Sequence, residues 1–182
     1  GNNKPPLRED MNIVPVNFYA STKLLNEHFA VLFSKEYGLE TVGFRYMSVY
    51  GPNEEAKGSY ANIISQFAWD MARDREPVIY GDGSQTRDFT NVRDVVDAMV
   101  LAIEYPKKLN AEIFNIGTGR ATSLNEIVTA LNNAFQKTMA AKYIENPVKE
   151  GYVLAQAADI SKIQRLLGYQ PSISLEEGIL DQ

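Results

Sequence analysis

The sequence predicts an α/β protein, because short runs of β-branched and aromatic residues alternate with longer segments in which apolar residues recur at helical spacing. Two further observations support this class. Strand-like runs lie at residues 41–46, 77–80 and 112–116, and glycines or prolines separate the strand-like segments from the helical ones. The order of segments therefore indicates a βα-type alternation.

The composition is that of a soluble globular protein with one sizeable core or two small ones: 182 residues, 45% hydrophobic and 23% charged. A net charge of -5 disfavours nucleic acid as a partner, since that binding needs clustered Lys and Arg. The chain has no Cys for disulfides, and its single histidine, His28, cannot form a multi-histidine metal site, so no metal is expected. No apolar run is long enough for a membrane span and residues 1–6 do not resemble a signal peptide, so the expected location is the cytoplasm, without a membrane partner.

The first helix is predicted over residues 18–37. Residues 1–16 hold three prolines and scattered charges, which indicates an extended loop before it. Either Asn17 or Ser21 can cap this helix, and Gly38 can end it. Its apolar stripe is expected to consist of Phe18, Leu24, Leu25, Phe29, Leu32 and Phe33.

The middle of the chain continues the alternation. Residues 41–46 are expected to form a buried strand, residues 47–53 a loop with a Gly-Pro turn, and residues 60–75 a second helix. Residues 77–80 read as a short strand that a tight turn at residues 81–84 follows. The inward side of the second helix is expected to carry Ile63, Ile64, Phe67, Trp69 and Met71.

Beyond Arg87, a brief strand is expected to lead into a third helix, which Pro106 ends. The apolar residues of this helix recur at Val95, Val96, Met99, Val100 and Ile103. The remaining elements are expected to be a strand at 112–116, a helix at 124–136 with a capping box of Ser123 and Glu126, a strand at 142–146, and a last helix that Asp159 caps and Gly168 closes.

Residues Gly117-Thr118-Gly119 follow a predicted strand and precede a helix, like half of a dinucleotide-binding loop. Thr122 stands where the third glycine of such a loop would be, and no acidic residue lies at the distance that would read a ribose. The sequence therefore argues against a dinucleotide loop at this position.

Tyr19 and Lys23 are a candidate acid–base pair at the head of the first helix. Their spacing of four residues places both side chains on one face of the helix, one turn apart. A phenol has a pKa of about 10, and both a nearby ammonium and a helix N-terminus lower that pKa toward neutrality. Taken alone, the pattern more often marks a half-buried tyrosine and a solvated lysine, so further motifs decide its meaning.

Five motifs occur in order along the chain: Tyr19-Ala-Ser-Thr-Lys23, Arg45-Tyr-Met-Ser-Val-Tyr-Gly-Pro52, Tyr80-Gly-Asp-Gly-Ser-Gln-Thr-Arg-Asp-Phe89, Asn115-Ile-Gly-Thr-Gly119, and Ala158-Asp-Ile-Ser-Lys162 leading to Leu167-Gly168-Tyr169. Together they resemble the second half of the NAD-dependent nucleotide-sugar epimerases and dehydratases, UDP-glucose 4-epimerase among them, in the extended branch of the short-chain dehydrogenase/reductase superfamily. The resemblance covers nearly the whole chain.

This resemblance implies the C-terminal part of a doubly wound Rossmann-type parallel sheet plus a small α/β substrate-binding lobe. Residues 1–58 would be the tail of the cofactor-binding domain. Residues 59–182 would be mainly the substrate-binding lobe, with residues 86–104 returning to the cofactor domain.

The resemblance also implies roles for residues at the cofactor. Tyr19 would be the general acid/base that takes the proton from a sugar hydroxyl. Lys23 would hold the nicotinamide ribose of NAD and lower the pKa of Tyr19. Tyr46, in the strand that follows, is assigned with them to the NAD site.

For the substrate, the resemblance assigns the diphosphate of a nucleotide sugar to Arg87, since a guanidinium offers fixed, charged donors to phosphate oxygens. Tyr80 would stack on the nucleotide base, and Asn62 matches a substrate-contacting Asn of epimerase-like members. Two positions assigned to the substrate site depart from the family pattern. Ser48 stands where a substrate-side Asn is usual and keeps a donor with a shorter reach, and Lys149 would substitute, as a point charge, for the arginine that is absent from the late nucleotide-binding motif.

The glycine-rich NAD loop and catalytic Ser/Thr of that family have no counterpart in these 182 residues. We therefore expect the chain to be part of a longer protein or a truncated product, with little NAD affinity and little turnover by itself.

The resemblance implies transient oxidation at C4 of a nucleotide-linked hexose, such as UDP-glucose or UDP-galactose, followed by epimerisation, which Asn62 favours. A nucleotide-sugar 4,6-dehydratase and a non-catalytic nucleotide-sugar-binding or oligomerising module are the alternatives. A homodimer through the Phe18–Tyr37 helix is expected, because similar proteins commonly pair through it.

Overall fold

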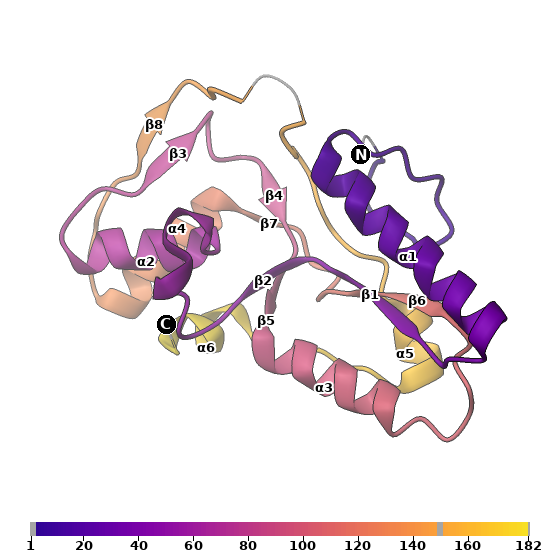
Figure 1. Cartoon of the computed structure of the whole chain (residues 1–182). Coiled ribbons are helices and arrows are strands. Elements are labelled where there is room, and N and C mark those ends of the chain that lie inside the picture. The colour runs from indigo at the N-terminus through magenta and orange to yellow at the C-terminus, as the bar shows by residue number, and fades with distance from the viewer. Residues whose placement is uncertain (1–2, 149–150, 182) are drawn as a thin grey trace.

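Helices and strands alternate along the chain in the computed structural model, which describes residues 3–148 and 151–181 (Figure 1). The α/β class predicted from the sequence is confirmed. The elements are α1 (Phe18–Tyr37), β1 (Val42–Tyr46), β2 (Ser48–Tyr50), the 3-10 helix η1 (Glu55–Tyr60), α2 (Ile63–Ala72), β3 (Val78–Tyr80), β4 (Thr86–Arg87), β5 (Phe89–Asn91), α3 (Val92–Ile103), β6 (Glu112–Ile116), β7 (Thr122–Ser123), α4 (Leu124–Phe135), β8 (Lys142–Ile144), α5 (Ser161–Leu167) and α6 (Leu175–Leu180).

Most strand pairing is parallel, between strands that lie far apart in the sequence. β1 pairs with β6, β2 with β5, and β3 with β8, all parallel, whereas the short strands β4 and β7 pair antiparallel. Phe44 of β1 lies opposite Phe114 of β6, and their rings are 6.5 Å apart. Parallel partners need long connections, and helices supply most of them here.

Two separate hydrophobic cores hold these elements together. The sheet core lies where β1 and β6 meet α3 and α5, and its buried residues are Val95, Ala98, Leu109, Phe114, Ile116, Ile163, Leu167 and Tyr169. The lobe core lies between α2, β3, α4 and α6, and its buried residues include Ile64, Phe67, Met71, Ile79, Ile127, Leu131 and Ile179. Strands β2 and β5 run between the two groups of elements (Figure 1).

These cores bear on the expected domain division without testing it. The sheet core packs α3 against β1, as expected if residues 86–104 belong to the cofactor domain. The same core also includes Phe114 and Ile163, which lie beyond residue 104. The division of the chain at residue 58 by function stays a prediction.

Helix α1 has the predicted ends. The side chain of Asn17 accepts a hydrogen bond from the Ala20 backbone at 2.8 Å and caps the helix, and Gly38 ends it in the left-handed conformation with φ 65°. Ser21 is inside the helix instead, where its hydroxyl donates to the Asn17 carbonyl. No α1 residue is buried, so the described chain leaves most of the apolar stripe exposed.

The region after β1 differs from the prediction. Residues 48–50, expected within a loop, form strand β2, because Ser48, Val49 and Tyr50 pair with β5, about forty residues further along. Helix α2 begins at Ile63 rather than near Tyr60, since η1 precedes it. Trp69, expected on the inward side of the helix, is only partly buried.

Helix α3 forms where predicted, but its buried face is narrower than the apolar pattern suggests. Val95 is buried, whereas Val96, Met99, Val100 and Ile103 are exposed; the exposed fraction of Ile103 is 81%. The carboxylate of Asp94 is buried instead and accepts hydrogen bonds from the Ser172 backbone and hydroxyl at 2.8 and 3.1 Å.

The C-terminal segment holds one predicted helix and one that the prediction missed. At α5, Ile160 occupies the N-cap position, although the Asp159 carboxylate accepts from the Ser161 backbone at 2.9 Å. Helix α6 was not predicted, and a capping box of Ser174 and Glu177 starts it. None of the helices in the described ranges has both the length and the apolar character needed to cross a lipid bilayer.

Candidate functional site

The predicted acid–base pair lies on one face of α1. The Lys23 Nζ is 5.1 Å from the centroid of the Tyr19 ring, as expected for side chains one helical turn apart. The exposed fraction of Tyr19 is 70%, so its phenol is open to a partner or a ligand. The structure therefore brings together the two residues to which the sequence assigned proton transfer.

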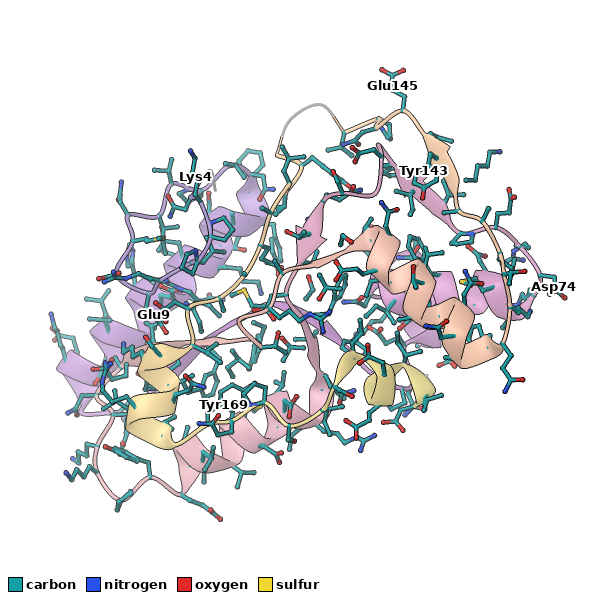
Figure 2. All side chains as sticks on the ribbon, turned by 180° about the vertical axis from the view of Figure 1, so that it is seen from behind. Lys4, Glu9, Asp74, Tyr143, Glu145 and Tyr169 are labelled. Atoms are coloured by element: carbon teal, nitrogen blue, oxygen red, sulfur yellow. The ribbon has the colours of Figure 1, made fainter. Side chains whose placement is uncertain are left out.

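An ion pair fixes α1 to the sheet core. Arg45 on β1 donates two hydrogen bonds of 2.8 Å to the two carboxylate oxygens of Glu27 on α1. A third bond from Arg45, of 3.1 Å, reaches the Glu9 carbonyl, and the Glu9 carboxylate accepts from the Asn115 backbone at 2.8 Å. Figure 2 shows Glu9 where the N-terminal segment meets this part of the molecule. The position of Tyr19 thus depends on Arg45, which belongs to one of the five motifs, and on Glu9 and Glu27, to which the sequence analysis assigned no role.

Two of the predicted residues lie at the carboxyl end of β1 and the start of β2. Tyr46 is half exposed, with its ring 6.2 Å from that of Phe44. The Ser48 hydroxyl donates to the side-chain carbonyl of Gln156 at 3.1 Å. Ser48 therefore has a polar partner that the sequence analysis did not identify.

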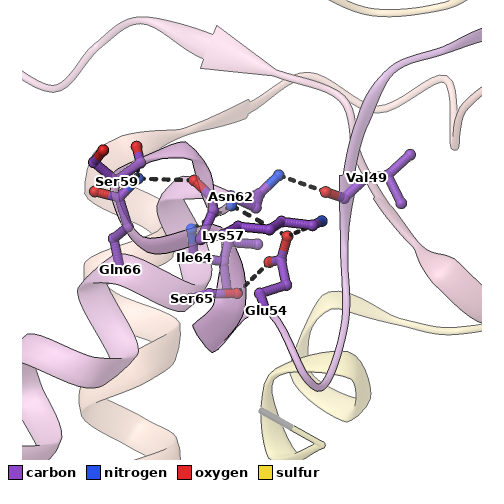
Figure 3. Close-up of polar contacts among 9 residues, drawn as sticks. Val49, Glu54, Lys57, Ser59, Asn62, Ile64, Ser65 and Gln66 are labelled. Atoms are coloured by element: carbon purple, nitrogen blue, oxygen red, sulfur yellow. Dashed lines mark hydrogen bonds and ion pairs between the residues drawn. The ribbon is translucent and has the colours of Figure 1, made fainter.

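Asn62 is held by the protein at both ends of its amide. Its Nδ2 donates to the Val49 carbonyl at 2.8 Å, and its Oδ1 accepts from the Ile64 backbone at 3.0 Å, which caps α2 (Figure 3). The observed contacts give Asn62 a structural role beside β2. Its contact with substrate stays a prediction.

A buried carboxylate, Glu54, organises the loop before Asn62 (Figure 3). It accepts hydrogen bonds from Lys57 Nζ at 2.7 Å, from the Asn62 backbone at 3.3 Å and from the Ser65 hydroxyl at 2.5 Å. A buried carboxylate is stable only when donors surround it in this way. The hydrogen bonds of Glu54 therefore connect η1 to the start of α2.

Tyr80 lines a cavity of about 310 Å³ in the lobe. The other lining residues come from η1, α2, β3, α4 and the segment after β8, and they are Ser59, Ile63, Gln66, Phe67, Asp70, Val78, Leu124 and Tyr152. A cavity lined by two tyrosines and several apolar side chains is suited to a flat aromatic ligand. The sequence predicted Tyr80 here and missed Tyr152, which belongs to none of the five motifs.

Arg87 lies beside this cavity and contacts it through Tyr152. The guanidinium carbon is 5.6 Å from the centroid of the Tyr152 ring, and Nη1 donates to the Thr86 carbonyl at 2.8 Å. Burial lowers the pKa of Arg87 from its ordinary value, and the neighbouring Tyr152 partly opposes that shift. The structure thus brings Arg87 and Tyr80 to one region, with Tyr152 between them.

The Gly117–Gly119 loop is occupied by the protein itself. The Asp88 carboxylate is fully buried and accepts hydrogen bonds from the Thr118 backbone (2.8 Å), the Thr118 hydroxyl (2.7 Å) and the Gly119 backbone (3.0 Å). These donors cannot also bind a phosphate. The loop is therefore no dinucleotide cradle, in agreement with the sequence analysis.

Lys149 lies outside the described residues. Within the described ranges, no three His, Cys, Asp or Glu side chains group closely enough to hold a metal ion.

These features define the class of the protein: an α/β chain with Rossmann-type parallel pairing, a Tyr-x-x-x-Lys helix bound to the sheet by an ion pair, and a lobe with an aromatic cavity. The model of the NAD dependent epimerase/dehydratase family matches residues 1–117. The chain belongs to this family.

Proteins named as nucleotide-sugar epimerases are similar to this chain in sequence and in fold. A putative UDP-glucose 4-epimerase from Methanocaldococcus jannaschii is 38% identical over 96% of this chain and 54% of its own length. The UDP-glucose 4-epimerase structure from Thermotoga maritima with UDP-glucose has a TM-score of 0.90 and 35% identity, over 99% of this chain and 57% of that one. A UDP-glucuronic acid 4-epimerase from Bacillus cereus, solved with UDP-glucuronic acid and NAD, has a TM-score of 0.88 and 30% identity, over 100% of this chain and 56% of that one.

The chain spans about half the length of the curated relatives it matches. NAD is the cofactor of the family. Tyr19 and Lys23 are suited to the nicotinamide ribose of that cofactor, whereas Asp88 occupies the Gly117–Gly119 loop, which therefore offers no site for its pyrophosphate.

Proposed function

We propose that this chain supplies the proton-transfer helix and the nucleotide-sugar lobe of an NAD-dependent nucleotide-sugar 4-epimerase. The observation that carries the proposal is the Tyr19–Lys23 pair, with 5.1 Å between the lysine nitrogen and the ring centroid, on a helix that Arg45 fixes to β1. The matching architecture of relatives solved with UDP-sugars supports it. The substrate class would be a nucleoside-diphosphate hexose such as UDP-glucose or UDP-galactose.

In this proposal the residues of the chain bind the sugar nucleotide and move one proton. Tyr19 accepts the proton of the sugar 4-hydroxyl and returns it at the end of the reaction, and the Lys23 ammonium stabilises the phenolate formed in between. Arg87 pairs with the diphosphate, and Tyr80 stacks on the base. NAD, when bound, supplies the hydride chemistry at C4.

The proposal is tested with Tyr19→Phe in an active protein that contains this chain. Loss of a general acid/base is expected to lower the rate of UDP-glucose and UDP-galactose interconversion by about 10²–10⁴-fold, with little change in sugar-nucleotide binding. Tyr37→Phe, at the far end of the same helix and 77% exposed, is the matched control. Unchanged turnover in Tyr19→Phe would remove this residue from the mechanism.

A binding role without catalysis is the second candidate, and the cavity lined by Tyr80 and Tyr152 favours it, because a nucleotide can bind there without proton transfer. Thermal unfolding with UDP-glucose, dTDP-glucose or NAD separates the two. A rise in Tm with a nucleotide sugar alone supports the binding lobe, and micromolar NAD binding by the 182-residue chain contradicts it.

We further propose that the protein forms a homodimer through α1. Helix α1 carries an exposed apolar stripe, which a second copy of the chain could bury. The exposed fractions lie between 46% and 52% for Leu25, Phe29, Leu32 and Phe33. Phe29→Glu is expected to shift the mass measured by light scattering from dimer to monomer. A monomeric wild-type protein at high micromolar concentration would refute the dimer.

A further inference from the structure

The buried amide of Gln85 connects the two tyrosines that line the lobe cavity. Its exposed fraction is 4%, and its Nε2 donates to the Tyr80 carbonyl at 2.7 Å and to the Tyr152 hydroxyl at 2.9 Å. Both amide hydrogens are thereby used. Gln85 thus links the backbone of Tyr80 to the hydroxyl of Tyr152, and both tyrosines line the cavity.

The same contact sets what the Tyr152 hydroxyl can do. Its oxygen accepts the hydrogen bond from Gln85, so its own proton is available for donation. Among the described residues, none accepts that proton. The Tyr152 hydroxyl therefore lines the cavity with its oxygen already hydrogen-bonded and its proton free to donate. Such a hydroxyl is suited to donate a hydrogen bond to an oxygen atom of a ligand.

The positive charge of Arg87, beside Tyr152, indicates which kind of ligand oxygen would accept the hydrogen bond. The guanidinium carbon of Arg87 is 5.6 Å from the centroid of the Tyr152 ring, and its Nη1 donates to the Thr86 carbonyl at 2.8 Å. A fixed cation at this point favours an anionic group over a neutral one. Phosphate oxygens near Arg87 would be strong acceptors for the Tyr152 hydroxyl.

The segment that carries Tyr152 is joined to the lobe at the same position in the sequence. Thr86, next to Gln85, donates from its backbone to the Leu154 carbonyl at 2.9 Å and accepts from the Gln156 backbone at 3.1 Å. Gln85 and Thr86 therefore hold the segment by side chain and by backbone. This double attachment organises Tyr152 before a ligand arrives, which reduces the entropy cost of binding.

We propose that Tyr152 donates its hydroxyl proton to the diphosphate of a bound nucleotide sugar, and that Gln85 is the positioning residue that aims this hydroxyl. The inference rests on the nucleotide-sugar binding proposed above. It assigns roles to Gln85, which lies inside a motif but had no predicted role, and to Tyr152, which belongs to none of the motifs. It predicts that the effect of Gln85 on affinity passes through Tyr152.

Calorimetric titration of UDP into the 182-residue chain tests the contact. Tyr152→Phe is expected to weaken UDP binding about tenfold, the loss of one hydrogen bond to a charged acceptor. The variant should remain folded, because Gln85 keeps the Tyr80 carbonyl as a partner. The matched control is Tyr143→Phe on β8, which removes a hydroxyl that bonds to Asn125 at the outer rim of the lobe and is expected to leave the Kd unchanged (Figure 2).

A double-mutant cycle tests the positioning role of Gln85. Gln85→Met keeps the length of the side chain without its donors and is expected to weaken UDP binding several-fold in the wild-type background. In the Tyr152→Phe background the same change should alter the Kd less than twofold. An equal loss in both backgrounds would show a merely structural role and overturn the positioning claim.

The outcomes separate this inference from the proposed function. UDP binding that Arg87→Ala weakens and Tyr152→Phe does not would overturn the Tyr152 contact alone and leave the nucleotide site in place. Absence of UDP binding by the wild-type chain would overturn the nucleotide site itself, and the inference would fall with it. Thermal unfolding of every variant checks that the measured losses concern folded protein.

Discussion

The guanidinium of Arg45 and the carboxylate of Glu27 form a two-pronged ion pair, with both hydrogen bonds at 2.8 Å, between β1 and α1. Both side chains are about four-fifths buried. Such a pair fixes direction as well as distance, because the planar guanidinium matches the two carboxylate oxygens. It therefore sets the position of the helix that carries Tyr19 and Lys23.

Loss of this pair is expected to loosen α1 specifically. Arg45→Met should lower the free energy of unfolding by about 1–3 kcal/mol, because it leaves the Glu27 carboxylate without its partner in a partly buried place. Urea unfolding measures the loss, and hydrogen exchange should show faster opening of α1 than of α4. The control is Arg8→Met, which removes an exposed pair with Asp10 and should leave the urea midpoint close to that of the wild type. Equal losses in the two variants would contradict the special role of Arg45.

Arg87→Ala is expected to weaken binding of a nucleotide sugar by about 1.5–3 kcal/mol, the range for a hydrogen bond to a charged group. Calorimetry with UDP-glucose measures the change. Arg120→Ala is the matched control, since the Arg120 side chain is exposed and its guanidinium contacts the Glu126 carboxylate at 3.4 Å. An unaltered dissociation constant in Arg87→Ala would place the diphosphate elsewhere.

Local signals in the sequence predicted the ends of several elements. Asn17, Gly38 and the Ser123–Glu126 capping box act where the sequence placed them, because each works through a backbone group within a few residues. Strand β2 was missed for the opposite reason. Its three residues are held by Phe89, Thr90 and Asn91, which no local pattern connects to them.

The candidate site was predicted to the extent that its residues belong to motifs. Tyr80 and Arg87 come from one motif and do lie in one region. Tyr152 and Gln156 follow a stretch without motif or periodicity, and only the folding of that segment against Thr86 brings them to Arg87 and Ser48. Gln85 lies within a motif, but its role depends on Tyr152 and could not be deduced without it.

Gly178 on α6 is expected to tolerate no side chain. A Cβ built there would lie 2.1 Å from the Tyr50 hydroxyl and 2.8 Å from the Asn91 amide nitrogen, and both residues are buried. Gly178→Ala should therefore destabilise the protein by about 1–3 kcal/mol through overpacking, although alanine favours a helix. Urea unfolding measures this loss. Leu180→Ala, a 71% exposed position on the same helix, should stay within about 0.5 kcal/mol of the wild type. A stabilised Gly178→Ala would mean that α6 moves away from Tyr50.

Stability is expected to fall in alkali through two buried phenols. Burial raises the pKa of Tyr50 to about 12, and burial also raises the pKa of Tyr169, whose hydroxyl donates to the Gly117 carbonyl at 3.1 Å. An unfolded tyrosine has a pKa of about 10, so above that pH the unfolded chain loses a proton that the folded chain keeps.

The stabilisation from each phenol is therefore complete below pH 10 and is lost as the pH rises toward the folded pKa, by at most about 1.4 kcal/mol per pH unit and group. Urea midpoints at pH 8, 10 and 11 should fall less steeply in Tyr169→Phe than in the wild type. Tyr37→Phe, whose ring is 77% exposed, should keep the wild-type slope. Because lysines and exposed tyrosines contribute equally to Tyr169→Phe and the wild type, the difference between these two slopes isolates the buried phenol. Parallel slopes in Tyr169→Phe and the wild type would mean that Tyr169 ionises in the folded protein as easily as in the unfolded chain.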